Sequence, residues 1–342
     1  MMVSAIGNSM ANAIKDSNRT DIVDNIRMAS WNIRMDAFPD SITVNETIAS
    51  LPSEIPSDPK SYYPKTDERP WSERRIAVAN TLLFDRADFV GLQEVTKRQL
   101  DDLQILLGDD FAHIGVGRDD GKEEGEYSPI FYKKSAAKLI DSDTFWLSKS
   151  PFEPSKYPGA GTIRICTAAH FQGNSGTFTY MNTHLDHLSD EQRGYGLSLV
   201  LHRAKYEAIK TQRPVFVTGD FNSKTDQLGY KVITGRTEPL ELNSTFTEKY
   251  SWSKEEEKEF IFKDLIGETA PERRSSNYAT FSGFAKPGGA KDYSRIDFVM
   301  GGSNGGWKSS SFRVGETLTD NGLWSSDHKP VYTDLTIYTG EY

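Results

Sequence analysis

Polar side chains follow several apolar segments of this chain at the points where predicted strands end. The tetrapeptide Gly219-Asp220-Phe221-Asn222 comes directly after the apolar run Val215-Phe216-Val217. Because side chains alternate along a strand, Asp220 and Asn222 are expected on one face, where a carboxylate and a carboxamide can act together. Asp, Asn and Gly also end strands as ordinary turn residues. The other strand ends of the chain decide between these two interpretations.

The same pattern recurs at other strand ends and close to the carboxyl terminus. Polar residues follow three more apolar segments, one carboxylate lies inside an apolar strand, and an Asp-His pair precedes the last predicted strand. Such repetition favours one functional site over a series of unrelated turns. The residues concerned are Asn32, Glu94, His184, Asp186, Asp297, Asp327 and His328.

These residue types suit the hydrolysis of a phosphate ester. Amide and carboxylate oxygens are the ligands that Mg²⁺ prefers, and the His-x-x-x-His spacing typical of zinc sites is absent from the set. Phosphate-ester hydrolysis needs a cation to neutralise the terminal oxygens, a base to activate water and donors for the developing charge. The set contains a candidate for each part.

The elements that must position these residues are short strands interrupted by a few helices. The predicted helices run from 72 or 73 to 86, from 96 onward with the capping pair Thr96 and Gln99, and from 189 to about 210. Many strands with few helices indicate packed sheets flanked by helices. The predicted strands are 27–33, 88–93, 112–117, 128–132, 163–171, 177–183, 215–219, 295–300 and 331–337.

The chain is predicted to form a single domain over residues 27–342, preceded by a flexible segment, 1–26. Two stretches look like insertions. Residues 36–70 contain six prolines, which predicts a long surface excursion without regular structure. Residues 247–264 include a charged stretch, 249–263, that is typical of a short solvated helix.

Composition limits the partners and the compartment. The net charge is −9, from 40 basic and 49 acidic residues, so the whole protein repels polyanions, although a locally basic cleft remains compatible with this balance. The chain has no 18-residue apolar stretch and no secretory signal, so we expect no transmembrane segment and an intracellular, cytoplasmic location. The single cysteine, Cys166, excludes an intramolecular disulfide and is expected in the core.

Six motifs, in order, closely resemble those of the endonuclease/exonuclease/phosphatase superfamily, whose fold is that of deoxyribonuclease I. The resemblance extends from about residue 28 to residue 337. Within the superfamily, the GVGRDDG stretch at 115–121 and the NTHLDH stretch at 182–187 are similar to those of one branch of hydrolases with poorly defined substrates. The motifs are Trp31-Asn32, Gln93-Glu94, Asn182 to His187, Gly219 to Asn222, Arg295 to Val299 and Ser326 to Val331.

The resemblance implies a fold and a metal site. The fold would be a four-layer α/β/β/α sandwich of two mixed sheets between helices, with the site at one edge of the sheets. Asn32, Glu94 and Asp327 would bind the metal, Mg²⁺ or Mn²⁺.

The resemblance also implies catalytic roles for five residues. His328 would be the general base, and Asp297 would hold its imidazole in one tautomer. Asp220 and Asn222 would position the attacking water and the phosphoryl oxygen. His184 would contact the scissile phosphate and help the leaving group depart.

Two further residues are expected to bind substrate, with alternatives left open. Arg118 lies in a glycine-bracketed loop, where its guanidinium could bind a phosphate or carboxylate, or merely pair with a neighbouring acid. Asp186 could bind a substrate hydroxyl or a second metal, or serve local hydrogen bonding. Arg164 and Arg193 are secondary candidates of the same kind as Arg118.

The resulting hypothesis is a metal-dependent phosphoesterase whose substrate is a small phosphorylated metabolite, sugar or lipid headgroup. The acidic balance and the lack of a dense basic run favour this substrate over a polynucleotide. Two alternatives are a nuclease acting on DNA or RNA and a catalytically inactive binding protein on the same fold. The sequence leaves the oligomeric state open.

Overall fold

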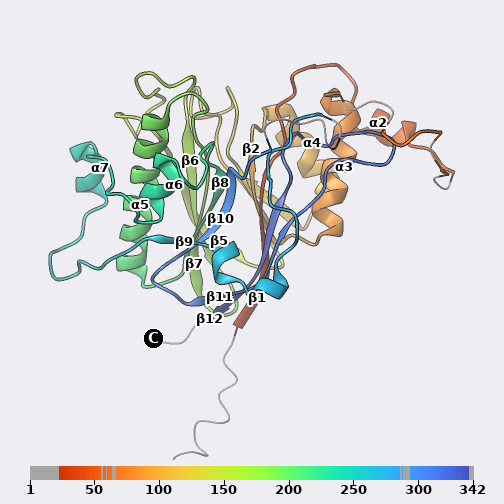
Figure 1. The fold of residues 1–342 in the computed structure, drawn as a ribbon. Helices are drawn as coiled ribbons and strands as arrows, with labels where there is room; N and C mark the ends of the chain where they lie inside the picture. Colours follow the sequence, from red (N-terminus) through yellow and green to blue (C-terminus); the bar gives the residue numbers. More distant parts are fainter. Residues whose placement is uncertain are drawn as a thin grey trace, which may run out of the picture.

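The computed structural model describes residues 23–54, 57–58, 60–63, 67–285, 287 and 293–338. Two mixed six-stranded sheets lie face to face, and helices cover the outer face of each, with α3 and α4 on one side and α5 and α6 on the other (Figure 1). The predicted four-layer α/β/β/α sandwich is therefore confirmed. Within the described residues, no helix combines the length and the apolar character needed to cross a membrane.

The first sheet has the strand order β11-β12-β1-β2-β4-β3. Its only parallel pair among the described residues is β1 with β2, so the carboxyl ends of these two strands lie at the same edge. Its strands are β1 (Val23–Asn32), β2 (Phe89–Gln93), β3 (Phe111–Ile114), β4 (Ile130–Lys133), β11 (Trp307–Val314) and β12 (Val331–Tyr338).

The second sheet has the strand order β5-β6-β7-β8-β10-β9. Here β7 and β8 are parallel, and each other neighbouring pair in the described part of the sheet is antiparallel. Its strands are β5 (Lys138–Trp146), β6 (Ile165–Gln172), β7 (Thr177–His184), β8 (Val215–Asp220), β9 (Phe262–Asp264) and β10 (Asp297–Gly302).

The three predicted helices are present, and α4 begins with the predicted capping box, in which Thr96 and Gln99 satisfy each other's backbone amides. The α5 cap at Ser189 accepts a hydrogen bond from the backbone N–H of Gln192. The helices are α2 (Val44–Ser50), α3 (Trp71–Phe84), α4 (Lys97–Leu107), α5 (Asp190–Thr211), α6 (Leu228–Ile233), α7 (Ser244–Lys249) and α8 (Leu265–Glu268), with a 3₁₀ turn at Pro271–Arg273.

Several local predictions need correction. The stretch 36–70 is not free of regular structure, because α2 forms within it behind a capping box at Thr43. The charged stretch 249–263 contains turns instead of a helix beyond the end of α7, and its last residues belong to β9. Strands β5, β9 and β11 were not predicted. They lie at sheet edges, and their sequences mix apolar with polar residues, so they resemble loops. β1 begins at Val23, earlier than predicted, and residues 1–22 of the predicted flexible segment lie outside the described residues.

Three apolar clusters hold the four layers together: one between α5 and the second sheet, one between the sheets, and one between the first sheet and α3 and α4. Between the sheets, the Phe89 ring of β2 meets Phe171 and Phe178 of the second sheet, with ring centroids 5.1 and 5.3 Å apart. Cys166 is fully buried in the cluster under α5, as predicted. Burial of these clusters is the main stabilising contribution to the sandwich.

A buried polar link also joins the two sheets below the site. Asn182 of β7 donates hydrogen bonds to the carbonyls of Leu92 (2.7 Å) and Pro129 (2.9 Å), and it accepts one from Gln93 (2.8 Å). Gly91 of β2 makes this approach possible, because a Cβ at that position would lie 2.4 Å from the Asn182 side-chain oxygen. Asn182 therefore fixes how the carboxyl ends of β2 and β7 meet.

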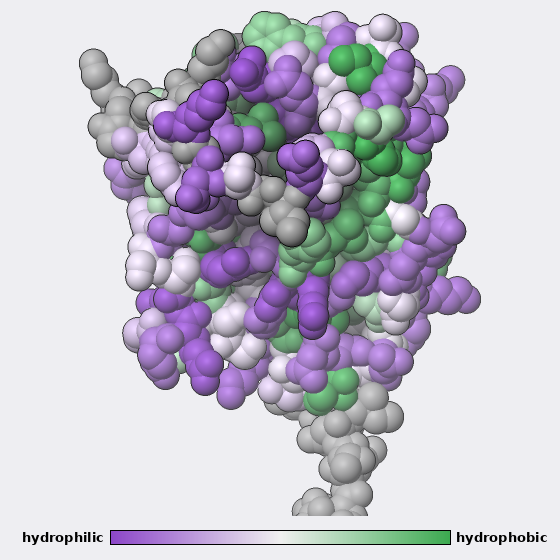
Figure 2. Space-filling view, turned by 90° about the vertical axis from the view of Figure 1, so that its right-hand side faces the viewer, coloured by the Kyte–Doolittle hydropathy of each residue, from purple (hydrophilic) through white to green (hydrophobic). Residues whose placement is uncertain are grey.

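The outer face of the α3 and α4 layer is largely hydrophilic, with apolar side chains gathered in a large patch toward the right of the view and in smaller areas elsewhere (Figure 2). Exposed apolar side chains on these helices are Leu83, Phe84 and Ile105. A predominantly polar outer face is what helices that pack one face on a sheet display.

His170 of β6 links three elements on the other side of the molecule. Its Nε2 lies 2.8 Å from Glu207 Oε2 of α5, and its Nδ1 contacts the Asp141 carboxylate of β5. Both acidic partners come from distant parts of the sequence. The Glu207 hydrogen bond, helped by Asp141, raises the pKa of His170 to about 9.

Replacing His170 with alanine is expected to destabilise the fold in a pH-dependent way. The pKa is higher in the folded protein than the unfolded value of about 6.5, so protonation stabilises the fold fully below that value, and this contribution is lost as the pH rises through about 9. Urea unfolding should show a loss of about 1–3 kcal/mol at about pH 6, which shrinks by about pH 10. An equal loss at both pH values would contradict the assigned charge.

Candidate active site

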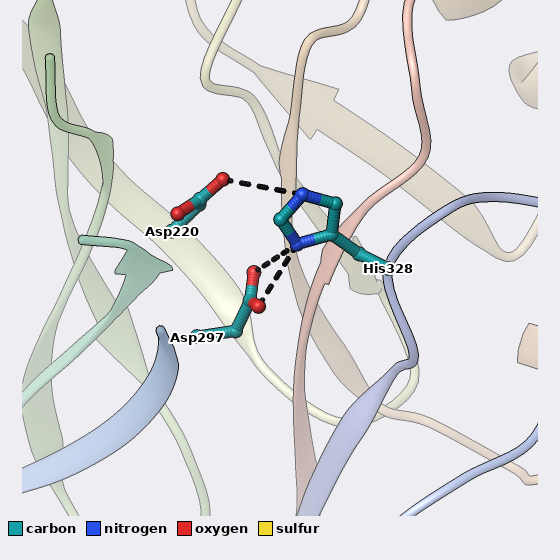
Figure 3. A group of neighbouring side chains, drawn as sticks. All are labelled: Asp220, Asp297 and His328. Atoms are coloured by element: carbon teal, nitrogen blue, oxygen red, sulfur yellow. Dashed lines mark hydrogen bonds and ion pairs between the residues drawn. The ribbon is translucent and has the colours of Figure 1, made fainter. Parts of the chain in front are cut away.

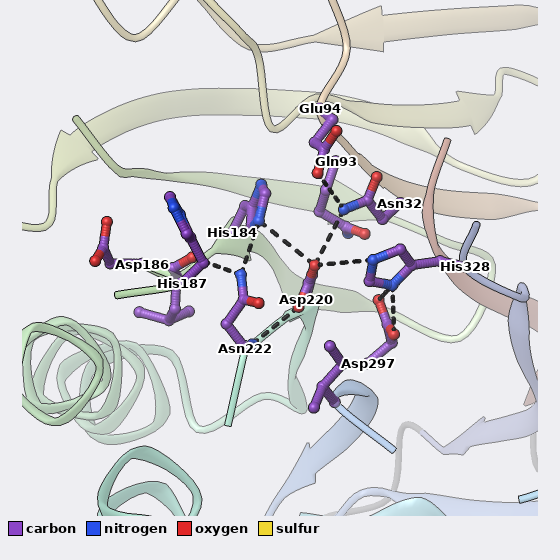
Figure 4. A network of polar contacts seen from close by, with 12 residues as sticks. Asn32, Gln93, Glu94, His184, Asp186, His187, Asp220, Asn222, Asp297 and His328 are labelled. Carbon is purple, nitrogen blue, oxygen red and sulfur yellow. Dashed lines mark hydrogen bonds and ion pairs between the residues drawn. The ribbon is translucent and has the colours of Figure 1, made fainter. Parts of the chain in front are cut away.

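Strand register brings the predicted residues together at one edge of the two sheets. Asp220, at the end of β8, is the register partner of His184 on the parallel strand β7 and of Asp297 on the antiparallel strand β10. In the first sheet, Asn32 at the end of β1 is paired with Gln93 at the end of β2. The carboxyl ends of two parallel pairs, one from each sheet, thus form the site (Figure 4).

His328 and Asp297 form a buried imidazole–carboxylate pair (Figure 3). His328 Nδ1 lies 2.9 Å from Asp297 Oδ2 and 3.2 Å from Oδ1, and both residues are buried. Burial alone would lower the pKa of His328, but the carboxylates of Asp297 and Asp220 raise it well above its ordinary value. Because Asp297 occupies Nδ1, Nε2 is left to face the site.

The loop that carries His328 is fixed from several sides. Trp31 Nε1 donates a hydrogen bond to the His328 carbonyl (2.8 Å), and Ser326 Oγ donates to the Asn32 carbonyl (2.7 Å). The Phe281 ring packs edge-on against the imidazole, with centroids 4.9 Å apart. These contacts hold the ring that a proton-transfer role requires in one orientation.

Asp220 lies at the centre of the polar network in Figure 4. Its Oδ2 accepts a hydrogen bond from Asn32 Nδ2 (3.0 Å) and lies 3.4 Å from His184 Nε2 and 3.7 Å from His328 Nε2. Its Oδ1 accepts the backbone N–H of Asn222 (2.9 Å). Burial and the neighbouring Asp297 carboxylate raise the pKa of Asp220 to about 7. A buried carboxylate with a strongly shifted pKa between two histidines is typical of a catalytic centre.

His184 and Asn222 lie on the other side of Asp220. The Asn222 side-chain nitrogen donates to the Leu185 carbonyl (3.0 Å), which fixes the amide orientation, and lies 3.1 Å from His184 Nε2. Burial, together with the positive charges of Arg164 and Arg118, lowers the pKa of His184 well below its ordinary value. His184 is therefore neutral at neutral pH, which suits a hydrogen-bonding role better than that of an acid.

The three predicted metal ligands lie on the β1 and β2 side of the site. Asn32 Nδ2 donates to Glu94 Oε1 (2.9 Å), and the Arg34 guanidinium lies 3.6 Å from Glu94 Oε2. Burial alone would raise the pKa of Glu94, but the Asn32 hydrogen bond and the positive charges of His328 and Arg34 lower it. Burial and the nearby Glu94 carboxylate raise the pKa of Asp327. Two carboxylates in a half-buried setting fit a hard divalent cation.

A second acidic group could also be considered for a metal. Among the described residues, Asp220, Asp297 and His328 each offer a ligand atom within 4.8 Å of the others. In this group, however, His328 Nδ1 is already hydrogen-bonded to Asp297. This hydrogen bond leaves fewer free ligand atoms in the group for a cation.

Three site residues have left-handed backbone conformations. Arg34, Glu94 and Asn222, each just beyond a strand end, have φ values of 57°, 59° and 46°. Residues other than glycine seldom adopt this conformation, and where they do the surrounding structure must hold them there. The strain turns the chain sharply, so that the side chains at these strand ends point into one site.

The two predicted substrate-binding residues differ in their surroundings. Arg118 forms two hydrogen bonds to Glu126, at 2.7 and 2.9 Å, beside a closed gap that His184 also lines. Asp186 is fully buried, and its oxygens accept backbone N–H groups of Gly161, Leu188 and Ser189. These contacts favour the loop-organising alternative for Asp186.

Sequence reasoning missed two residues of the site. Arg34 lies 3.6 Å from Glu94, and Thr280 Oγ1 accepts the backbone N–H of Asp297 (3.1 Å). No residue-type pattern marks Thr280, because it acts through a contact between distant segments. Arg34 carried a signal, since it lies two residues beyond Asn32 and bears a charge.

The fold and the arrangement of the site define a class of phosphoester-hydrolysing sandwich proteins. The model of the endonuclease/exonuclease/phosphatase family matches residues 29–328, so the chain belongs to that family. The description of that family covers nucleases and phosphatases, which both hydrolyse phosphoester bonds. A search of curated proteins gave no match.

Solved structures agree with the family assignment. A family protein from Bacteroides vulgatus is 29% identical, with a TM-score of 0.68 over 92% of this chain and 99% of that one. The mannosyl-6-phosphatase of Bacteroides thetaiotaomicron is 25% identical, with a TM-score of 0.66 over 91% of this chain and 99% of that one. The human Nocturnin catalytic domain, 17% identical, shares the fold with a TM-score of 0.59, over 92% of this chain and 95% of that one.

Proposed function

We propose that this protein is a divalent-metal-dependent phosphoesterase that uses water activated by a general base, and that its substrate is a small phosphorylated metabolite, sugar or lipid headgroup. The observation that carries the proposal is the continuous network from buried Asp297 through His328 and Asp220 to His184 and half-buried Asn222. It combines a base, its orienting carboxylate and donors for a phosphoryl group within one site.

In this mechanism the neutral form of His328 removes a proton from the attacking water. The water oxygen bonds to phosphorus as the ester oxygen leaves, and the proton moves to His328 Nε2. Asp297 makes the imidazole a stronger base and stabilises the imidazolium that forms. Asp220 accepts a hydrogen bond from the same water and so directs a lone pair of the water oxygen at phosphorus. Asn222 and neutral His184 hydrogen-bond the phosphoryl oxygens.

Asn32, Glu94 and Asp327 would hold the divalent cation, Mg²⁺ or Mn²⁺. The cation would neutralise charge on the phosphoryl oxygens when bound. The donor set fits such a cation, because amide and carboxylate oxygens are the ligands that Mg²⁺ prefers, and burial together with the Glu94 carboxylate raises the pKa of Asp327. Arg34, 3.6 Å from Glu94, provides partial charge balance on the same side.

Two observations support a small substrate. The net charge of −9 disfavours binding to a long polyanion. A mannosyl-6-phosphatase, 25% identical over nearly the whole chain, acts on a phosphorylated sugar. We therefore place phosphorylated sugars first among the candidate substrates.

Removal of the divalent cation is expected to abolish turnover. A panel of phosphomonoesters, phosphodiesters and single-stranded and duplex DNA and RNA should be assayed with Mg²⁺ and again after EDTA treatment. Hydrolysis should fall by roughly 100-fold or more with EDTA and return on addition of Mg²⁺ or Mn²⁺. Activity that is unaffected by chelation would overturn the proposed mechanism.

The same panel separates the alternatives. Turnover of polynucleotides alone, with an affinity that drops steeply as salt is added, would identify a nuclease. Metal binding without turnover of any phosphoester would identify a binding protein. Turnover of small phosphoesters supports the proposal.

A further inference from the structure

Arg74 of α3 is a fully buried arginine whose hydrogen bonds, in the described part of the chain, all go to backbone carbonyls. A guanidinium has five N–H groups, and each of them has a partner here. Burial lowers the pKa of Arg74 to about 10, so the side chain is charged at neutral pH. The five carbonyls are those of Ile33 (2.8 Å), Arg34 (3.1 Å), Met35 (3.2 Å), Arg69 (2.9 Å) and Ser325 (2.7 Å).

Three of these carbonyls belong to the turn that follows β1, residues 33–35, and N–H groups of the same turn bind two predicted cation ligands. The backbone N–H of Arg34 donates to Asn32 Oδ1 (2.9 Å), and that of Met35 donates to Glu94 Oε2 (3.1 Å). Arg34 has a left-handed backbone, with φ 57°, so surrounding contacts must hold the turn in this shape. Arg74 holds it from the carbonyl side.

The same guanidinium joins this turn to the loop before β12, residues 325–330. Arg74 Nη1 donates to the carbonyls of both Ile33 and Ser325. Asp327, the third predicted cation ligand, lies two residues beyond Ser325. A buried charge that is hydrogen-bonded only to carbonyls has a large desolvation cost, which an apolar side chain at this position would avoid. The contacts point to a role in the geometry of the site.

We propose that Arg74 is a positioning residue that holds the turn after β1 and the loop before β12 at the separation at which Asn32, Glu94 and Asp327 bind one divalent cation. The inference rests on the proposed function, from which it takes the cation site, and it adds a residue that acts through the backbone of the ligands. Groups behind metal ligands fix the orientation of those ligands, and their replacement lowers metal affinity by roughly 10- to 100-fold.

Mn²⁺ binding to the natural protein and to Arg74→Gln tests this role without any turnover. Titration followed by electron paramagnetic resonance should show that the variant binds Mn²⁺ roughly 10- to 100-fold more weakly. Binding should be weakened and not abolished, because Gln99 Nε2 also donates to the Arg34 carbonyl (2.8 Å) and remains in the variant. Equal affinities of the two proteins would overturn the inference.

Arg75, the next residue of α3, provides a matched control. Arg75 is also fully buried, but its guanidinium donates to Asp102 of α4 (2.9 Å), to the Thr47 hydroxyl of α2 and to the carbonyls of Ile42 and Thr43. Arg75→Gln should therefore lower the melting temperature and leave the Mn²⁺ affinity unchanged. An equal fall in Mn²⁺ affinity in both variants would assign the effect to the packing of α3 and overturn the inference.

Arg74→Lys separates the charge from the number of hydrogen bonds. Lysine keeps the positive charge but has three N–H groups, so it cannot bind all five carbonyls. Its Mn²⁺ affinity should lie between those of the natural protein and Arg74→Gln. If Arg74→Gln does not fold, the lysine variant carries the comparison, with folding checked by thermal unfolding in EDTA. A folded lysine variant with the natural Mn²⁺ affinity would contradict the inference.

Kinetics at increasing Mn²⁺ concentration distinguish a weakened cation site from a general loss of structure. On a phosphoester that the natural protein hydrolyses, the kcat/KM lost in Arg74→Gln should return as Mn²⁺ is raised, because His328 is held by other contacts, from Asp297 and Trp31. A loss that Mn²⁺ does not restore would count against the positioning role.

Failure of the proposed function gives a different result. A natural protein that binds Mn²⁺ but cleaves no phosphoester would end the proposed hydrolysis, while the binding comparison would still decide the role of Arg74. A natural protein that binds no Mn²⁺ would overturn both.

Discussion

Replacing His328 with alanine is expected to lower kcat by roughly 100-fold or more, the range of lost general acid–base assistance. His328 is the site histidine whose Nδ1 is held by a buried carboxylate, 2.9 Å away, while Nε2 faces Asp220. Without the imidazole, no group in the proposed mechanism removes the water proton. Steady-state kinetics on a phosphoester that the natural protein hydrolyses would measure the loss.

Asp297, the carboxylate that holds the His328 ring, provides the sharpest control. Because Asp297 acts through His328, Asp297→Asn should lower kcat in the natural background and add little in the His328→Ala background. His328→Gln, which preserves more of the buried volume, separates lost chemistry from lost packing. Full additivity of the two changes would contradict the assigned pair.

The fold followed from the sequence to the extent that local patterns specify it. Apolar strands that end in polar residues placed β1, β2, β7 and β8, and the capping pair of Thr96 and Gln99 marked the start of α4. Edge strands such as β11 were not predicted, because the many polar residues in their sequences are also typical of loops. The α2 helix was not predicted, because prolines on both sides of it indicated an irregular segment.

In the candidate site, pairs of residues close in the sequence could be predicted, whereas contacts that only the strand order creates could not. Asp220 and Asn222 are two residues apart, so a strand pattern suffices to pair them. That Asp220 lies opposite both His184 and Asp297 depends on the strand order of the second sheet, which no local pattern contains.

Replacing Asp220 with asparagine is the second change expected to have a large effect. The substitution keeps the shape of the side chain but removes an acceptor that receives a hydrogen bond from Asn32 and lies near both histidines. An amide in this place directs N–H groups at the water and the imidazoles, so kcat should fall by roughly 100-fold or more. KM should change little, because the groups assigned to the phosphoryl oxygens remain.

The same variant should be more stable than the natural protein when both are free of metal. Asp220 and Asp297 are buried register partners whose carboxylates repel each other, and this repulsion adds to burial in raising the pKa of Asp220. Removing one of the two charges should raise the free energy of unfolding by about 1–2 kcal/mol, measured in EDTA by chemical denaturation. Lower activity with higher stability identifies a residue retained for chemistry. If the variant were both less active and less stable, Asp220 would be a structural residue. Unchanged activity would remove Asp220 from the mechanism.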